Sequence, residues 1–239
     1  MQPQLNIGEH WLVSIYHSHN ALINKLCEFH MDTLFTAWIA MAGIILFSLV
    51  VTKKLSRIPD GLQAFAEMVM EFIESIAVGQ IGKDGYKHVP LIGSLFLFIL
   101  IGNLLGQLPW NVYHLAQGEL ASPTNDLNVT VALALFVSIY YFGFGISKKG
   151  IKYFGHYLKP FWFLLPINIL EDFTRPLTLA LRLFGNIIAG EIIIMLALTF
   201  VPFLVPIPVM LFELFVAVIQ AFIFSVLSAS YIAVVTEEH

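Results

Sequence analysis

Five long apolar stretches alternate with short polar segments along the 239-residue chain. The first, Thr33 to Val51, holds about 19 residues without a charge, close to the ~20 that a helix needs to cross the hydrocarbon core of a bilayer. The sequence therefore predicts an all-α, polytopic membrane protein, with residues 33–239 forming a single membrane domain. Its five embedded helices are expected at about residues 33–51, 89–108, 128–146, 161–201 and 209–235.

The fourth stretch is too long for a helix that stands perpendicular to the membrane. If wholly helical, residues 161–201 would measure about 60 Å, roughly twice the hydrocarbon thickness. Either this helix is steeply tilted, or Pro166 breaks it near its start. A proline-rich turn at Pro202, Pro206 and Pro208 then leads into the last stretch, and we expect the last two helices to be long and tilted.

Residues 62–78 have a different pattern and are predicted to form an amphipathic helix that does not span. Pro59-Asp60-Gly61 breaks the chain before it and offers Asp60 as a helix cap. One face is apolar, and the other carries Glu67, Glu71 and Glu74. The pattern fits a helix lying in the membrane interface, and it fits a helix packed against a partner subunit nearly as well.

Composition supports the membrane assignment. Only 12% of the residues are charged and 58% are hydrophobic, whereas a soluble domain carries about 25% charged residues. The polar segment 1–32 contains His10, His17, His19 and His30, but their spacing matches no metal motif, and we interpret them as interfacial or solvent-facing.

The distribution of basic residues predicts the orientation. Nine of the twelve lysines and arginines lie in the loops after the first span, before the second and after the third. By the positive-inside rule these loops are cytoplasmic, so the N-terminal segment 1–32 is expected outside and the C-terminus inside.

Ionisable residues are concentrated in the fourth stretch. On a helix, five polar side chains recur three or four residues apart and share one stripe, namely Glu171, Arg175, Thr178, Arg182 and Asn186. Glu191 lies about half a turn round from Arg182 and about 13 Å further along the axis, so the two form no local salt bridge. Because charged groups at membrane depth usually line an ion path, we place this stripe, including Glu171 and Arg175, on a candidate path with Glu191.

The last stretch adds Glu213 and Gln220, which are seven residues apart and therefore on one helix face. Antiparallel packing should bring Glu213 to the depth of Glu191, so the two carboxylates are expected to form one path on the outer side, which Gln220 extends inward. The alternative is that Glu213 lies in the headgroup region, where the helix dipole favours an acidic residue near a helix start.

Soluble-enzyme motifs are absent from the sequence, which has no phosphate-binding glycine loop, no metal-ligand spacing and no nucleophile–base pair. We therefore expect no cofactor, no metal ion and no nucleic-acid partner.

Two motifs occur in the polar part of the last two stretches. They are Leu181-Arg182-Leu183-Phe184-Gly185-Asn186, followed by Ala189-Gly190-Glu191, and Gln220-Ala221-Phe222-Ile223-Phe224. With the supporting stretches 123–130 and 165–172, they resemble subunit a of the F-type ATP synthase, particularly its chloroplast and cyanobacterial form. The resemblance covers about residues 59–231.

The resemblance implies an ion-translocating stator subunit with two aqueous half-channels against a rotating ring of c subunits. The family's ring-contacting arginine falls on Arg182, its half-channel carboxylate on Glu191, and two supporting amides on Asn186 and Gln220. Glu213 departs from the family, in which this position is histidine in some bacteria and glycine in chloroplasts. The implied partners are the c-ring, the b subunits of the peripheral stalk, the rest of the ATP synthase and membrane lipid, and the chain would be no enzyme by itself.

One alternative function stays open, a proton-coupled secondary transporter, although the internal repeats typical of such folds are not seen. A proton is the expected ion, with sodium as the alternative. The expected location is a bacterial plasma membrane, with the thylakoid membrane as the alternative.

Overall fold

The computed structural model describes residues 12–14, 28–53, 55–107, 122–150, 165–200 and 206–236. These contain six α-helices, namely α2 Met31–Thr52, α3 Leu62–Ile81, α4 Val89–Gly106, α5 Leu127–Lys149, α6 Leu165–Phe200 and α7 Pro206–Thr236. Two 3-10 helices, η1 Gly82–His88 and η3 Pro123–Asn125, precede α4 and α5. Five helical segments of the described chain are long and apolar enough to cross a membrane. The predicted all-α, polytopic fold is confirmed.

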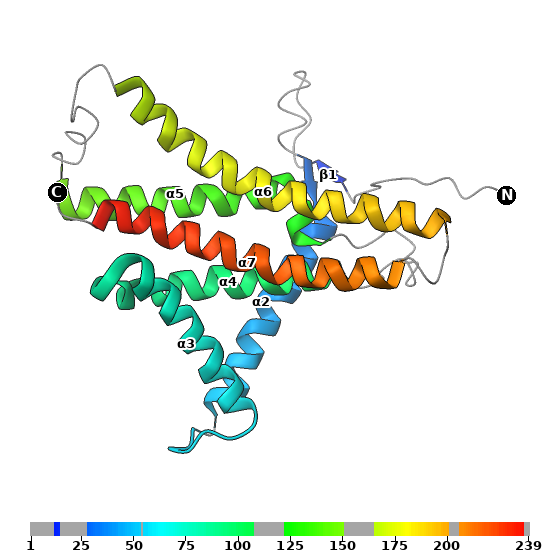
Figure 1. Ribbon diagram of the computed structural model, residues 1–239, viewed down its shortest axis with the longest axis horizontal. Helices are drawn as coiled ribbons and strands as arrows, with labels where there is room; N and C mark the ends of the chain where they lie inside the picture. The colour runs from blue at the N-terminus through cyan, green and yellow to red at the C-terminus, as the bar shows by residue number, and fades with distance from the viewer. Residues whose placement is uncertain are drawn as a thin grey trace.

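The four helices α4 to α7 extend along the long axis of the molecule, and α2 and α3 lean away from them (Figure 1). Helix α7 is central, since it packs against α3, α4, α5 and α6. Its buried positions include many small side chains, namely Ala217, Ala221, Ser225, Ser228 and Ala229. Small residues let membrane helices approach closely, which explains how one helix can contact four others.

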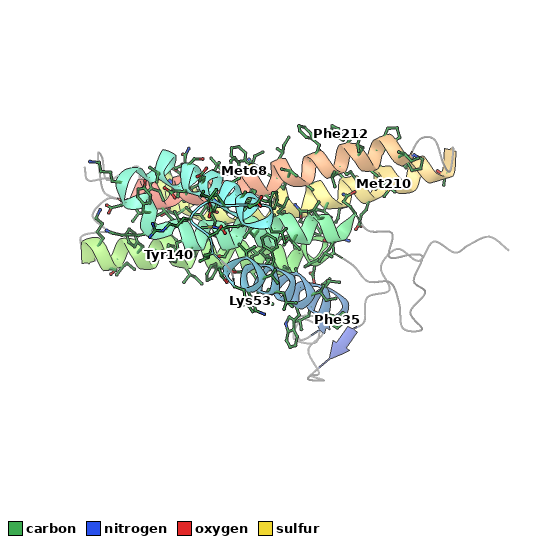
Figure 2. The ribbon with its side chains drawn as sticks, turned by 90° about the horizontal axis from the view of Figure 1, so that it is seen from below. Phe35, Lys53, Met68, Tyr140, Met210 and Phe212 are labelled. Carbon is green, nitrogen blue, oxygen red and sulfur yellow. The ribbon has the colours of Figure 1, made fainter. Side chains whose placement is uncertain are left out.

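The outer surface of this helix assembly is strongly apolar. Figure 2 shows Phe35 on α2 and Phe212 on α7, whose side chains are 56% and 65% exposed. Exposed apolar surface of this extent marks contact with a membrane or with other proteins. The surface therefore agrees with the membrane assignment from composition.

The structure corrects the role predicted for several prolines. Within the described residues α6 is continuous from Leu165 through Pro166 and Pro176, so neither proline breaks it. Pro206 and Pro208 were assigned to the turn before the last helix, but they form the first turn of α7. The ends of α2, α4 and α5 differ from the predicted spans by no more than three residues.

Helix α3 follows the predicted amphipathic segment, although its start is not capped as expected. Gly61, rather than Asp60, is the N-cap residue, and it makes no side-chain capping bond. The apolar face is only partly covered, because Ile73 and Ile76 are buried while Phe65 remains 53% exposed. Its interfacial placement stays a prediction.

A short antiparallel strand pair precedes α2, and the sequence patterns did not predict it. β1 Leu12–Ser14 pairs with β2 Glu28–His30, with Leu12 opposite His30. His10, His17 and His19 lie outside the described residues.

Candidate functional site

A cavity of about 320 Å³ lies between α4, α6 and α7, and a few polar side chains interrupt its mostly apolar lining. Three of the predicted site residues line it, namely Asn186 and Glu191 of α6 and Glu213 of α7, together with Asn103 and Gln107 at the end of α4. The antiparallel course of α6 and α7 thus brings the two carboxylates to one cavity, as the sequence analysis expected. In the part of the chain that the structure describes, no group of His, Cys, Asp or Glu side chains is suited to hold a metal ion.

Glu191 is held from outside its own helix. The side-chain amide of Asn125, at the end of η3, donates to both of its oxygens, at 2.8 Å to Oε1 and 2.9 Å to Oε2. Hydrogen bonds to an ionised group are shorter and stronger than neutral ones, so this contact fixes the direction of the carboxylate.

Helix η3 reaches this position because two glycines leave room for it on α4. A Cβ atom on Gly106 would lie 2.9 Å from the Cβ atom of Ser122, and one on Gly102 would lie 3.2 Å from the Thr124 methyl group. The Ser122 hydroxyl also donates to the Gly102 carbonyl oxygen at 2.8 Å. Small residues four apart form a flat helix face, and here that face seats η3 beside the cavity.

Glu213 projects from the opposite wall. Its Oε2 accepts a hydrogen bond from the Gln107 amide at 3.0 Å. Its Oε1 lies against Gly190, where a Cβ atom would overlap the carboxylate. Gly190 therefore leaves the space that this carboxylate occupies.

Within the described residues, several buried polar atoms where α4 meets α7 have no hydrogen-bond partner. They are Asn103 Oδ1, Gln107 Oε1, Glu213 Oε1 and Gln220 Nε2. Buried polar atoms are nearly always paired with protein or water, and a cavity of this size has room for water molecules beside these atoms. The arrangement suits a hydrated path from Glu213 toward Gln220, which is buried on α7 and does not line the cavity.

The two arginines of α6 have different surroundings. Arg175 pairs with Glu171 at 2.6 Å and with Asp172 at 3.3 Å, and its guanidinium lies 5.4 Å from the centre of the Tyr231 ring. Arg182 is exposed, and among the described residues no carboxylate pairs with it. Arg182 lies one helical turn before Asn186, where the cavity begins, while Arg175 and Glu171 lie further toward the start of α6.

Sequence reasoning missed three amides in this site. Asn103 and Gln107 were not among the predicted site residues, and Asn125 lay only within the resembling stretch 123–130. The available signal was their hydrogen-bonding chemistry at membrane depth, which usually marks a buried site.

Comparison with known proteins identifies the family. The family model described as ATP synthase A chain matches residues 34–233. The chain belongs to the ATP synthase A chain family. It is 46% identical over 240 residues to the chloroplastic ATP synthase subunit a of Stigeoclonium helveticum, covering 99% of this chain and 93% of that protein. It is 44% identical to the chloroplastic subunit a of Oedogonium cardiacum, covering 99% and 91%.

The family confirms the function expected from the resemblance. The chain is the proton-translocating stator subunit of the membrane sector, a component of the ATP synthase complex, and a multi-pass membrane protein. Nothing in these comparisons favours the secondary transporter.

Proposed function

We propose that the cavity between α4, α6 and α7 is the outer half-channel of this subunit, and that Arg182 separates it from an inner half-channel. The observation that carries the proposal is the position of Arg182, which is exposed and one turn beyond the cavity wall at Asn186. A proton that crosses the cavity would leave it beside this guanidinium.

The surroundings of Arg182 support a protein partner with a carboxylate. The neighbouring face of α6 carries Leu177 and Leu181, which are 45% and 51% exposed. An arginine facing lipid at this depth would cost about 3 kcal/mol on insertion scales. A membrane-embedded carboxylate on each subunit of a rotating c-ring would compensate the charge, while the leucines contact the ring surface.

The charge of the Arg182 guanidinium controls where the ring carboxylate gives up its proton. The guanidinium stays charged at every relevant pH, so a ring carboxylate that meets it is deprotonated. The pair must remain transient and hydrated, because a dry, tight ion pair would stall rotation. The same positive charge blocks direct passage of protons between the half-channels, and each charge crossing the membrane yields about 2.3 kcal/mol per 100 mV.

Arg175 and Glu171 belong to the inner end of this path. Two carboxylates and the Tyr231 ring already neutralise and hold Arg175. Arg175 therefore does not compete with Arg182 for a ring carboxylate, and the Glu171 side chain, which is 57% exposed, can exchange protons with water at the exit.

The partners follow from the family and from the exposed surfaces. The α6 face around Arg182 takes the c-ring, and lipid and the b subunits of the peripheral stalk cover other apolar faces, including those of α2. The subunit performs no ATP chemistry by itself.

Residues 33–239 act as one membrane domain, with α3 at the membrane interface. The chloroplastic relatives support a location in the thylakoid membrane more than one in a bacterial plasma membrane.

The test is Arg182→Ala in the whole complex, with Arg57→Ala, an exposed loop arginine, as the matched control. Arg182→Ala should abolish ATP-driven proton pumping and ATP synthesis in vesicles, while the c-ring and the soluble ATPase still copurify. Arg57→Ala should pump normally. Normal coupled pumping by Arg182→Ala would refute the proposal.

A further inference from the structure

The contact between Asn125 and Glu191 joins residues that are 66 positions apart in the sequence. The amide nitrogen of Asn125 only donates, and an ionised carboxylate only accepts. Both oxygens of Glu191 therefore turn toward η3, at 2.8 and 2.9 Å. We infer that Asn125 is a positioning residue for Glu191, an inference that rests on the proposed role of the cavity as the outer half-channel.

Asn125 is anchored on one side by α4. Its backbone N–H donates to the Ser122 carbonyl oxygen at 3.0 Å, which closes the single turn of η3. The Ser122 hydroxyl in turn bonds to Gly102 of α4. The amide therefore extends from a turn whose place on α4 is set by hydrogen bonds and by the glycine face.

The next residue anchors Asn125 on the other side. Asp126 accepts a hydrogen bond from the Asn128 backbone N–H at 2.8 Å and so caps α5. It also accepts one from the Thr33 hydroxyl at 3.2 Å, which links it to α2. A group that orients a reacting side chain is effective when its own position is fixed. Contacts with α2, α4 and α5 fix the position of Asn125.

The geometry also depends on the charge of Glu191. On a protonated carboxyl group one oxygen carries the hydrogen and becomes a poorer acceptor, so the contact of the amide with both oxygens is weaker. Proton uptake by Glu191 therefore weakens the contact, and proton release restores it. Two acidic groups lie on the elements packed around Glu191, namely Glu213 across the cavity on α7 and Asp126 next to Asn125. The charged residues of α5 are at the opposite end of that helix, namely Lys148 and Lys149.

The experiment compares Asn125→Leu with Asn128→Leu in the assembled ATP synthase. Both variants replace an asparagine near the start of α5 by an apolar side chain, but Asn125 bonds to Glu191, whereas the Asn128 side chain is exposed. Asn125→Leu should lower ATP-driven proton pumping about tenfold, the loss expected for a charge-assisted hydrogen bond. Asn128→Leu should pump like the wild type.

A second variant separates positioning from folding. The Asn125→Asp side chain can donate to Glu191 only while the pair holds a proton, and two ionised carboxylates this close repel each other. We expect the pumping rate of Asn125→Asp, divided by the wild-type rate at the same pH, to approach one at low pH and to fall as the pH rises. A loss that is equal at every pH would overturn the inference, as would failure of both Asn125 variants to assemble.

The double variant Asn125→Leu with Glu191→Gln distinguishes this inference from the proposed function. If Asn125 acts through Glu191, the double variant should lose no more than Glu191→Gln alone. Independent, multiplying losses would refute the role of Asn125. Unchanged pumping by Glu191→Gln itself would instead refute the proposed half-channel.

Discussion

Gly190 shows how one missing side chain shapes the ion path. The Glu213 carboxylate occupies the space where a Cβ atom on Gly190 would lie. The obstructing atoms are the far end of a flexible side chain, which can rotate away, so a methyl group here would displace the carboxylate rather than the helix.

The first prediction follows from this contact. Gly190→Ala should leave assembly intact, because alanine is better than glycine within a helix by about 0.5–1 kcal/mol. It should lower proton pumping to the level of Glu213→Gln, because the displaced carboxylate loses its bond from Gln107. Gly143→Ala is the control, since no atom lies within 4 Å of a Cβ atom there. A wild-type pumping rate in Gly190→Ala would show that the position of Glu213 is unimportant.

At the level of single residues, chemistry was easier to predict from the sequence than contacts were. The polar stripe singled out both Arg175 and Arg182, but only the structure shows that Arg175 is paired and Arg182 is exposed. The Asn125 contact could not be predicted, because no periodicity relates a 3-10 turn to a helix 66 residues later. Such contacts depend on how helices pack, which the hydrophobic pattern leaves open.

At the level of elements, the length of each apolar stretch predicted the membrane helices well. The positions of the prolines were a poor guide to where the helices begin. The pattern located every membrane helix of the described chain, because a lipid-facing helix must be apolar over its whole length. Pro206 and Pro208 were misplaced because proline is tolerated in a first helical turn as readily as in a loop. The role of the amides Asn103 and Gln107 at the end of α4 could not be predicted, because it depends on the packing of α7 beside them.

The pairing of α6 with α7 leads to a prediction on the two carboxylates that line one cavity. Carboxylates in one low-dielectric site tend to share a proton and act as a unit. Glu191→Gln should therefore lower proton flux at least tenfold, a modest part of what a positioned proton-transfer group contributes. Glu213→Gln should have a mild effect, and the double variant should be far from additive. The measurement is passive flux against pH in vesicles stripped of the soluble ATPase; strictly additive losses would mean two separate paths.

At the scale of the whole molecule, the lengths of α6 and α7 constrain how these helices cross the membrane. Helix α6 has 36 residues and α7 has 31, which correspond to about 54 and 46 Å, whereas the hydrocarbon core is about 30 Å thick. Helix α2 has 22 residues, about 33 Å, and leans away from the long pair (Figure 1). The two long helices therefore exceed what a perpendicular span needs, and their extra length fits an inclined course or ends that extend beyond the hydrocarbon core.

The last prediction concerns the orientation of this whole assembly. The Lys148 ammonium group donates to the Thr236 carbonyl oxygen at 2.9 Å, so the ends of α5 and α7 lie on one side of the molecule, the side that the basic residues predict to be inside. In a Cys27→Ser background, which removes the single natural cysteine, Ser147→Cys beside Lys148 should react with an impermeant thiol reagent only from inside. Glu119→Cys, in the loop without lysine or arginine, should react from outside. Both variants must first show normal proton pumping, so that the labelling reports the native fold. The reverse pattern would invert the orientation and exchange the outer and inner half-channels. Labelling of both sites from one side would contradict the crossing of the membrane by α5.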